Sequence, residues 1–325
     1  MNLPSRLKSA SKVLKPIAQL LVIGVTTAYV VRAVATNWSQ VAALDIRLRS
    51  QHLVALGLAW VYLVGRGLLW HRIVRKTVGD MPLRLDVACW LASQLGKYVP
   101  GKVVLVLGRV IVYRERGASA AGVGAAFLLE MLALFSTASL LALLASHTSV
   151  GPVPLPFRLM AAGAFAGFVA LCHPRWFRLA AKLVRRYRAG APELPLHRFR
   201  DALSWIGLMT LDWAILGSGF FLLADSLVAL EPTMLLPLTA AFALAGTAGI
   251  LVLVAPSGLG VREGVLTALL APVLGAGVAA ALAILARLWM TAAEVLSALA
   301  ALPFLRSQRP LLSSESPSVG EAPPP

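Results

Sequence analysis

The sequence has few charged residues. Only 14% of its 325 residues are Asp, Glu, Lys or Arg, whereas 58% are hydrophobic. In a typical soluble domain about a quarter of the residues are charged. The mean hydropathy is +0.79. These values exclude a water-soluble enzyme.

Acidic residues are scarcer than basic ones: 14 Asp and Glu stand against 30 Lys and Arg, and the net charge is +16. In a soluble protein this balance would indicate a nucleic-acid partner. Here the basic residues lie in short segments between apolar blocks, as expected from the positive-inside rule and from contact with anionic lipid headgroups. We therefore predict membrane lipids, and no nucleic acid, as partners.

Cysteine and histidine are also rare. Cys89 and Cys172 lie far apart in apolar stretches, and the five histidines form no HExxH pattern. The sequence has no GxxxxGK[ST] motif for a nucleotide. It therefore predicts no metal site, no cofactor and no catalytic residue. The first apolar block, residues 16–34, lacks a small-x-small cleavage site, which favours a membrane span over a signal peptide.

Long apolar blocks dominate the rest of the chain. A helix crosses a membrane with about 20 apolar residues. Six blocks predict full spans: residues 16–34, 52–70, 118–145, 157–172, 203–224 and 278–304. The predicted fold class is therefore an all-α integral membrane protein, with residues 1–305 as one polytopic domain. The Ser- and Pro-rich residues 306–325 predict a disordered cytoplasmic tail.

Two further apolar regions are broken in their middles. Residues 87–112 are interrupted at Pro100 and Gly101, and residues 235–275 at Pro256, Gly258 and Gly260. Proline lacks an amide hydrogen and glycine tolerates a turn, so each region predicts two half-length helices. Lipid cannot satisfy the freed backbone groups, which favours re-entrant hairpins that line a protein cavity. The alternative is an ordinary loop between two spans.

The basic residues also predict an orientation. If both broken regions are re-entrant, five basic segments fall on one side, including the N-terminus and the eight Lys and Arg between residues 175 and 200. That side would be the cytoplasm, so both termini are predicted to be cytoplasmic. The high Ala, Arg and Pro content is typical of a GC-rich bacterial genome, which places the protein in a bacterial inner membrane.

The order of the predicted elements repeats. Span, span, hairpin and span occur in residues 16–146 and again in residues 157–304. Three full spans in each half give the halves opposite orientations, which predicts an inverted repeat. In such folds the substrate site lies near the membrane midplane, where the broken helices of the two halves meet.

The longest segment between spans covers about residues 173–200. It mixes Trp176, Phe177, Leu179 and Leu183 with several arginines. This pattern predicts an amphipathic helix in the cytoplasmic interface that acts as an anchor.

Ionisable residues inside spans cost about 3 kcal/mol each, so each is a candidate site. In chain order these are Arg66, Lys97, Lys102, Arg109, Glu130, Asp212, Arg262, Glu263, Arg287 and Glu294. Four basic members, Lys97, Lys102, Arg262 and Arg287, could bind phosphate beside the N-terminal ends of the half-helices. The glutamates could neutralise those cations or relay protons. The alternative is internal ion pairs that lock the helices, with Arg66 and Arg109 snorkelling.

The two broken motifs resemble a known family. The segments SQLGKYVPGK (residues 93–102), Gly108-Arg109, Glu130, PSGLGVREG (residues 256–264) and Arg287 are similar, in order and spacing, to the lysylphosphatidylglycerol synthase transmembrane family of flippase-like proteins. The resemblance covers most of the chain. Its motifs are specific for the family and not for a substrate.

The resemblance implies movement of a phospholipid or lipid-linked molecule between leaflets, a role best established for members fused to a cytosolic aminoacyl-lipid synthase. Only a short tail follows residue 304, so the synthase activity is not carried over. The translocator role falls on the residues at motif positions: Lys97, Tyr98, Pro100, Gly101, Arg109, Glu130, Arg262, Glu263 and Arg287. Two alternatives stay open, a membrane-embedded transferase for a polyprenyl-phosphate or lipid, and a non-catalytic partner of a separately encoded lipid-modifying enzyme.

Overall fold

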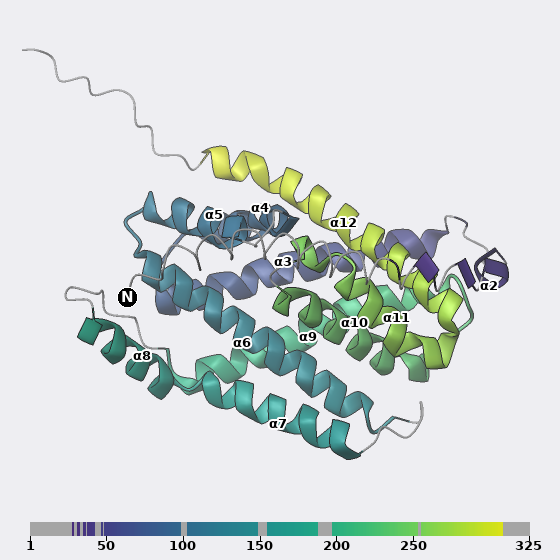
Figure 1. Ribbon diagram of the computed structural model, residues 1–325. Helices are drawn as coiled ribbons and strands as arrows, with labels where there is room; N and C mark the ends of the chain where they lie inside the picture. Colours follow the sequence, from purple (N-terminus) through teal and green to yellow (C-terminus); the bar gives the residue numbers. More distant parts are fainter. Residues whose placement is uncertain are drawn as a thin grey trace, which may run out of the picture.

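The computed structural model describes residues 28, 31–32, 35–36, 38–42, 47, 49–98, 103–148, 155–187, 197–252 and 255–307, and over these residues it contains helices and no strand (Figure 1). Five helical stretches are long and apolar enough to cross a membrane: Ser50–Thr77, Ala120–Ala145, Phe199–Asp225, Pro232–Leu251 and Ala276–Leu305. The protein is thus an all-α chain with the helices of a multi-pass membrane protein.

Four of the six predicted spans match these helices. They correspond to α3 (Ser50–Thr77), α6 (Ala120–Ala145), α9 (Phe199–Asp225) and α12 (Ala276–Ser307). The predicted span at 157–172 is α7 (Leu155–Leu171), an apolar helix of 17 residues. The predicted span at 16–34 falls almost entirely outside the described residues. The short helix α2 (Trp38–Ala42) follows it and contacts α12.

The first broken region folds as two short helices. α4 (Leu83–Ser93) continues into a 3-10 turn, η1 (Gln94–Tyr98), and α5 (Val103–Arg114) follows. With 11 and 12 residues, α4 and α5 are each too short to cross a membrane. Pro100, Gly101 and Lys102, predicted at the break itself, lie outside the described residues.

The second broken region differs from the prediction in one arm. A 3-10 turn, η2 (Pro232–Met234), leads into α10 (Leu235–Leu251), and together they form 20 helical residues instead of a half-length helix. Pro237 lies in the first turn of α10, where the missing amide hydrogen costs no intrahelical bond, so it does not shorten the helix. The second arm, α11 (Val261–Leu274), has 14 residues, as expected for a short helix.

The break between α10 and α11 has a tight backbone. The 3-10 turn η3 (Pro256–Gly258) contains Ser257 at φ 51° and Gly258 at φ 66°, and Gly260 follows at φ 81°. A Cβ atom on Gly258 would lie 2.6 Å from the Cα of Gly249, so glycine is required there by the approach of α10. Pro256 begins the turn.

The helices form one bundle around the central pair α3 and α9, which pack against each other. On one side of this pair α4 contacts both α3 and α12, and on the other α10 contacts both α9 and α6. α7 packs on α6, and α11 packs on α10 and α12. Figure 1 shows α3, α6, α9 and α12 running through the bundle, with α4 and α5 stacked over one end of it.

The predicted amphipathic segment contains α8 (Pro174–Tyr187). Trp176, Leu179 and Leu183 are exposed along one side of α8, whereas Phe177 is buried against the ring of His197. Such a helix suits the membrane interface. α12 continues to Ser307 and so includes the first two residues of the predicted tail, and residues 308–325 lie outside the described part of the chain.

Candidate functional site

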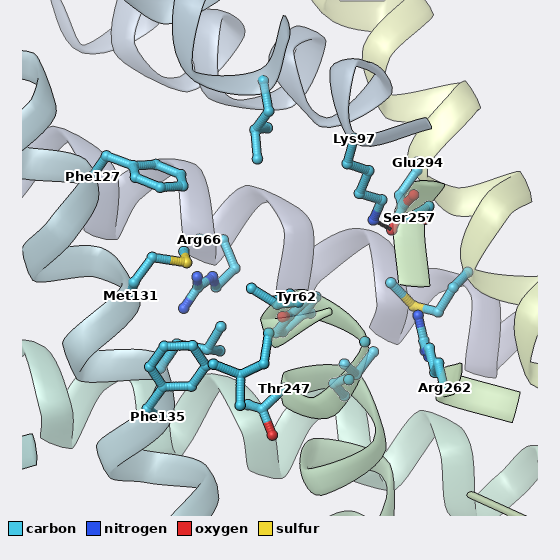
Figure 2. Close-up of a pocket in the computed structure, with 18 of the residues that line it drawn as sticks. Tyr62, Arg66, Lys97, Phe127, Met131, Phe135, Thr247, Ser257, Arg262 and Glu294 are labelled. Carbon is cyan, nitrogen blue, oxygen red and sulfur yellow. Dashed lines mark hydrogen bonds and ion pairs between the residues drawn. The ribbon is translucent and has the colours of Figure 1, made fainter. Parts of the chain in front are cut away.

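A cavity of about 610 Å³ lies inside the bundle, between the two broken regions (Figure 2). Its polar lining consists of four charged side chains, Arg66, Lys97, Arg262 and Glu294, together with Tyr62, Thr247 and Ser257. The remaining lining is mainly apolar and comes mostly from α5, α6 and α10, including Leu105, Leu107, Phe127, Met131, Phe135, Phe242 and Ile250. A cavity with a few charges on an apolar wall suits a ligand that is itself amphipathic.

The cavity extends to the outer surface of the bundle. Leu107 on α5 and Leu251 at the end of α10 both line it, and they are 50% and 63% exposed. Side chains on the outer surface of a membrane-spanning bundle face lipid. The cavity therefore reaches the surface of the bundle near Leu107 of α5 and Leu251 of α10.

One end of the cavity is bordered by a buried network centred on Glu130. Its Oε1 accepts hydrogen bonds from Arg66 Nη2 at 3.0 Å and from Trp90 Nε1 at 2.7 Å, and its Oε2 accepts one from Arg109 Nη1 at 2.7 Å. Arg109 Nε also donates to Ser93 Oγ at 2.9 Å. These contacts join α3, α4, α5 and α6, and they fix the first hairpin to the bundle.

The two arginines of this network do not snorkel. Arg66 is 4% exposed and Arg109 is 1% exposed. The guanidinium of Arg109 lies 4.2 Å from the centre of the Trp70 ring, a cation–π contact. The snorkelling alternative is thus wrong for both residues, because both guanidinium groups bind the buried carboxylate of Glu130 instead of extending to the membrane surface.

A second network fastens the other hairpin. Glu263 on α11 accepts a hydrogen bond from the Gly260 amide at 2.7 Å on Oε2, and one from Arg287 Nη1 at 3.1 Å on Oε1. Arg287 Nη1 also donates to the Ser257 carbonyl at 3.2 Å. Arg287 on α12 therefore holds the start of α11 and the turn η3 in place.

A third set of contacts ties the tip of the first hairpin to α12. Lys97 Nζ lies 2.5 Å from Glu294 Oε1, and Tyr98 Oη donates to Glu294 Oε2 at 2.8 Å. Tyr98 Oη is also 3.1 Å from Thr291 Oγ1, and its ring lies 5.5 Å from the guanidinium carbon of Arg287. Figure 2 shows Lys97 and Glu294 meeting at the cavity wall. Glu294 thus neutralises a cation that the cavity would otherwise expose.

Arg262 is the predicted binding residue that polar contacts hold least. Its guanidinium carbon lies 4.5 Å from the Phe242 ring centre, and the side chain is half-buried. Within the residues that the structure describes, its guanidinium makes no hydrogen bond or ion pair. In Figure 2 it lies on the side of Lys97 and Glu294, and Arg66 lies on the side of Phe127 and Met131.

The structure thus separates the predicted binding residues into two groups. Lys97, Arg262 and Glu294 line the cavity, whereas five others lie behind its wall in the networks that hold the hairpins: Tyr98, Arg109, Glu130, Glu263 and Arg287. The alternative of structural ion pairs therefore describes Arg109–Glu130 and Glu263–Arg287. Lys102 lies outside the described residues.

Sequence reasoning missed several cavity residues. Tyr62 lines the cavity from α3, and Trp213 lines it from α9. Arg66, an ionisable candidate to which sequence reasoning assigned no binding role, also lines it from α3. The spacing of Tyr62 and Arg66, four residues apart on one helix face, was an available signal. It also missed a network outside the cavity, in which Asp86 accepts hydrogen bonds from Tyr113 Oη at 2.5 Å and pairs with His71 Nδ1 at 2.6 Å.

Within the described part of the chain, no group of three or more His, Cys, Asp or Glu side chains comes together as metal ligands would. Cys89 and Cys172 are both buried free thiols. No protein-family model matches the chain, and no curated protein sequence matches it significantly.

Proposed function

We propose that the protein moves a phospholipid or a lipid-linked molecule between the leaflets of a bacterial cytoplasmic membrane. The observation that carries this proposal is the cavity, which combines charged side chains with apolar lining residues that reach the surface of the bundle on α5 and α10. A charged headgroup could enter such a space while its acyl chains stay outside. The resemblance to the lysylphosphatidylglycerol synthase transmembrane family points the same way and remains a prediction.

The packing of the helices supports an inverted repeat. α3, α4 and α6 of the first half correspond in order to α9, α10 and α12 of the second. If each helix is replaced by its counterpart, every contact between them should have an equivalent. The contact α3–α4 corresponds to α9–α10, α4–α12 corresponds to α10–α6, and α3–α12 corresponds to α9–α6. All six contacts are present. Repeats of this kind place a substrate site where the halves meet, which is where the cavity lies.

The hairpin ion pairs follow the same correspondence. In the first half Arg109 of α5 pairs with Glu130 of α6, and in the second half Glu263 of α11 pairs with Arg287 of α12. Each pair fastens the short second arm of a hairpin to the span that follows it, with the signs of the charges exchanged. This similarity favours two hairpins of common design over two unrelated loops.

The hairpin tips support re-entrant hairpins. The turns η1 and η3 contact each other, although they belong to opposite halves. If the halves are inverted, their hairpins enter from opposite membrane faces, so tips that touch must both lie inside the membrane. Both termini would then be cytoplasmic, as the basic residues predict.

The cavity charges favour a headgroup with a phosphate. Arg262 forms no ion pair among the described residues, although the charges of Glu294 and Glu263 act on it, and Lys97 is the cation that Glu294 pairs with. A phosphate would supply the hydrogen-bond acceptors that Arg262 lacks. The apolar walls from α5, α6 and α10 would contact the glycerol and upper acyl carbons.

A leaflet-exchange assay tests the proposed function. The purified protein is placed in vesicles with fluorescent anionic or zwitterionic phospholipids, and quencher-accessible lipid is followed over time. Gly246→Leu should abolish exchange, because Gly246 lines the cavity and an added Cβ would meet only Trp213 at 3.8 Å, so the side chain would fill the space.

Gly207→Leu is the matched control. Gly207 lies exposed on α9, and an added Cβ would meet nothing within 4 Å. This variant should exchange lipid like the wild type. Wild-type protein that moves none of the lipids, or equal exchange by the two leucine variants, would contradict translocation through the cavity.

A further inference from the structure

A buried aspartate in the middle of α9 is not used by the networks above. Asp212 is the 14th of the 27 residues from Phe199 to Asp225, and it is 7% exposed. Its Oδ2 is buried and has no hydrogen-bond partner in the part of the chain that the structure describes. A carboxyl group at the centre of an apolar span without a donor is unusual, because burial of a charged group is costly unless it is paired.

The other buried carboxylates are all satisfied. Both oxygens of each accept hydrogen bonds or ion pairs within the described residues, and the groups in question are Asp86, Glu130, Glu263 and Glu294. Asp212 is the exception. Burial of an ionised carboxylate without donors is costly, which favours the protonated form of Asp212.

Few charged groups face Asp212 from the helices around it. α3 contributes Arg66, whose charge acts on Asp212, and the hydroxyl of Tyr62. α6 contributes Glu130, which reaches this region through its ion pair with Arg66, and α12 contributes Glu294, which acts on Tyr62. α10 has no ionisable residue. Arg66 is thus the cation that a charged Asp212 would engage.

Arg66 is itself only partly satisfied. Its Nη2 donates to Glu130 Oε1 at 3.0 Å, but Nε and Nη1 are buried without a partner among the described residues. Arg66 lines the cavity, and so does Trp213, whose Nε1 is also buried without a partner. Guanidinium and indole N–H groups only donate, so a ligand that pairs with these atoms must bring acceptor oxygens.

Gly65 allows the approach of α9 to α3 at this point. A Cβ atom on Gly65 would collide with Oδ1 of Asp212, so the absence of a side chain lets the carboxyl group reach the backbone beside Arg66. The acid and the arginine with free donors therefore lie at one helix crossing, and Arg66 lines the cavity there.

We propose that Arg66 and Asp212 form a proton-coupled binding site for a phosphate diester in the cavity. When Asp212 is protonated, Nε and Nη1 of Arg66 and Nε1 of Trp213 are free to donate to phosphate oxygens. When Asp212 loses its proton, its carboxylate competes with the ligand for Arg66. At a pH where Asp212 is ionised in the empty site, binding of one anion thus takes up one proton from water onto Asp212, and the anion and the proton together add no net charge.

The assignment of the phosphate to a lipid rests on the proposed function. The proton coupling of the site does not depend on that function. The binding test therefore uses two probes, fluorescent phosphatidylglycerol and soluble dimethyl phosphate, because each keeps one negative charge across neutral pH. Binding is measured with the purified full-length protein in detergent between about pH 5.5 and about pH 8.5. Proton uptake is read in the same sample with a pH-sensitive dye.

For the wild type we expect affinity to fall as pH rises, approaching about tenfold per pH unit once Asp212 is deprotonated. About one proton should be taken up per ligand at the upper end of the range. Asp212→Asn, which is neutral at every pH and of similar size, should bind with the affinity that the wild type has at low pH and show no pH dependence. Arg66→Gln should weaken binding at low pH by at least tenfold.

Asp80→Asn is the matched control, since Asp80 is exposed and pairs only with Arg75 among the described residues. It should keep the wild-type pH dependence. Binding of either probe with this pH profile supports the site, and the probe that binds identifies lipid or free diester as the source. Wild-type binding that does not vary with pH, or a pH profile that survives in Asp212→Asn, overturns the proposal.

The two proposals can fail separately. If Asp212→Asn does not fold, proton uptake by the wild type still tests the coupling. Zero protons taken up per bound ligand would contradict it. pH-dependent binding without leaflet exchange would keep the site and remove translocation. Leaflet exchange in which Asp212→Asn behaves like the wild type at all pH values would keep translocation and remove the coupling.

Discussion

Lys97 and Glu294 are 197 residues apart in the sequence, and their Nζ and Oε1 atoms lie 2.5 Å apart. Lys97 belongs to η1 at the tip of the first hairpin, and Glu294 belongs to the last span. Both line the cavity. The pair therefore connects the tip of the first hairpin to α12 at the cavity wall.

Breaking this pair should destabilise the protein. Lys97→Met would leave Glu294, which is 3% exposed, with only the hydroxyl of Tyr98, and loss of one partner of a buried pair costs about 3 kcal/mol or more. The double variant Lys97→Met/Glu294→Gln should lose less than the sum of the single variants. Thermal unfolding in detergent measures both, and Lys182→Met on the exposed side of α8 is the control. Strict additivity would show that the two residues do not interact.

The turn between α10 and α11 should tolerate no side chain at Gly258. Its φ of 66° and the contact with the Gly249 Cα predict that Gly258→Ala costs at least about 1–3 kcal/mol. Gly207→Ala, in open space on α9, should instead stabilise by up to about 1 kcal/mol. Unfolding temperatures of the two variants that move in the same direction would contradict the backbone geometry of this turn.

One histidine outside the spans predicts a pH dependence of stability. His197 is 3% exposed, its Nε2 donates to the Cys172 carbonyl at 2.8 Å, and its Nδ1 is buried without a partner among the described residues. Burial lowers the pKa of His197 below its ordinary value of 6.5. Its contribution to stability is therefore complete above that value and is lost as pH falls through the lower folded-state pKa.

We expect the unfolding temperature to drop below about pH 6.5, and His197→Gln to flatten that drop while lowering the temperature at neutral pH. His147, exposed after α6, gives the control variant His147→Gln, which should keep the wild-type profile. An unfolding temperature that rises on acidification would contradict the burial of a neutral His197.

The proposed orientation predicts the sides of two loops. Thr148 follows α6 and Asp225 ends α9, and both should lie on the side opposite to the termini if the halves are inverted. Reporter tags inserted at these residues should be accessible from outside intact cells, whereas a tag at the C-terminus should not. A cytoplasmic tag at either loop would contradict the inverted repeat.

The sequence predicted four of the membrane-crossing helices and the break at residues 256–260, because apolar length and Pro/Gly content are local properties. It did not predict the length of α10, since the effect of Pro237 depends on its place in the first turn. The partners of the charges are a tertiary property: Glu130 is 64 residues from Arg66, and α9 must pack on α3 before Asp212 meets Gly65. For that reason the sequence named Arg66 as an ionisable candidate and gave it no partner or binding role.

The cavity walls had no sequence signal. Leu107 and Phe135, which line the cavity, and Leu128, which is exposed, are all apolar residues in apolar helices. A residue that faces lipid and one that faces an amphipathic ligand are chosen from the same set of side chains. Only the packing of α5, α6 and α10 distinguishes them.

Reversible blocking of the cavity mouth tests lipid movement through it most directly. Leu107→Cys is made in a background with Cys89→Ala and Cys172→Ala, labelled with a bulky methanethiosulfonate reagent, and assayed for leaflet exchange before labelling, after labelling and after reduction. Leu211→Cys is the control, since Leu211 is exposed on α9 and does not line the cavity. We predict that exchange stops on labelling of residue 107 and returns on reduction, with no change for residue 211. Exchange that continues with residue 107 fully labelled would contradict a route between α5 and α10.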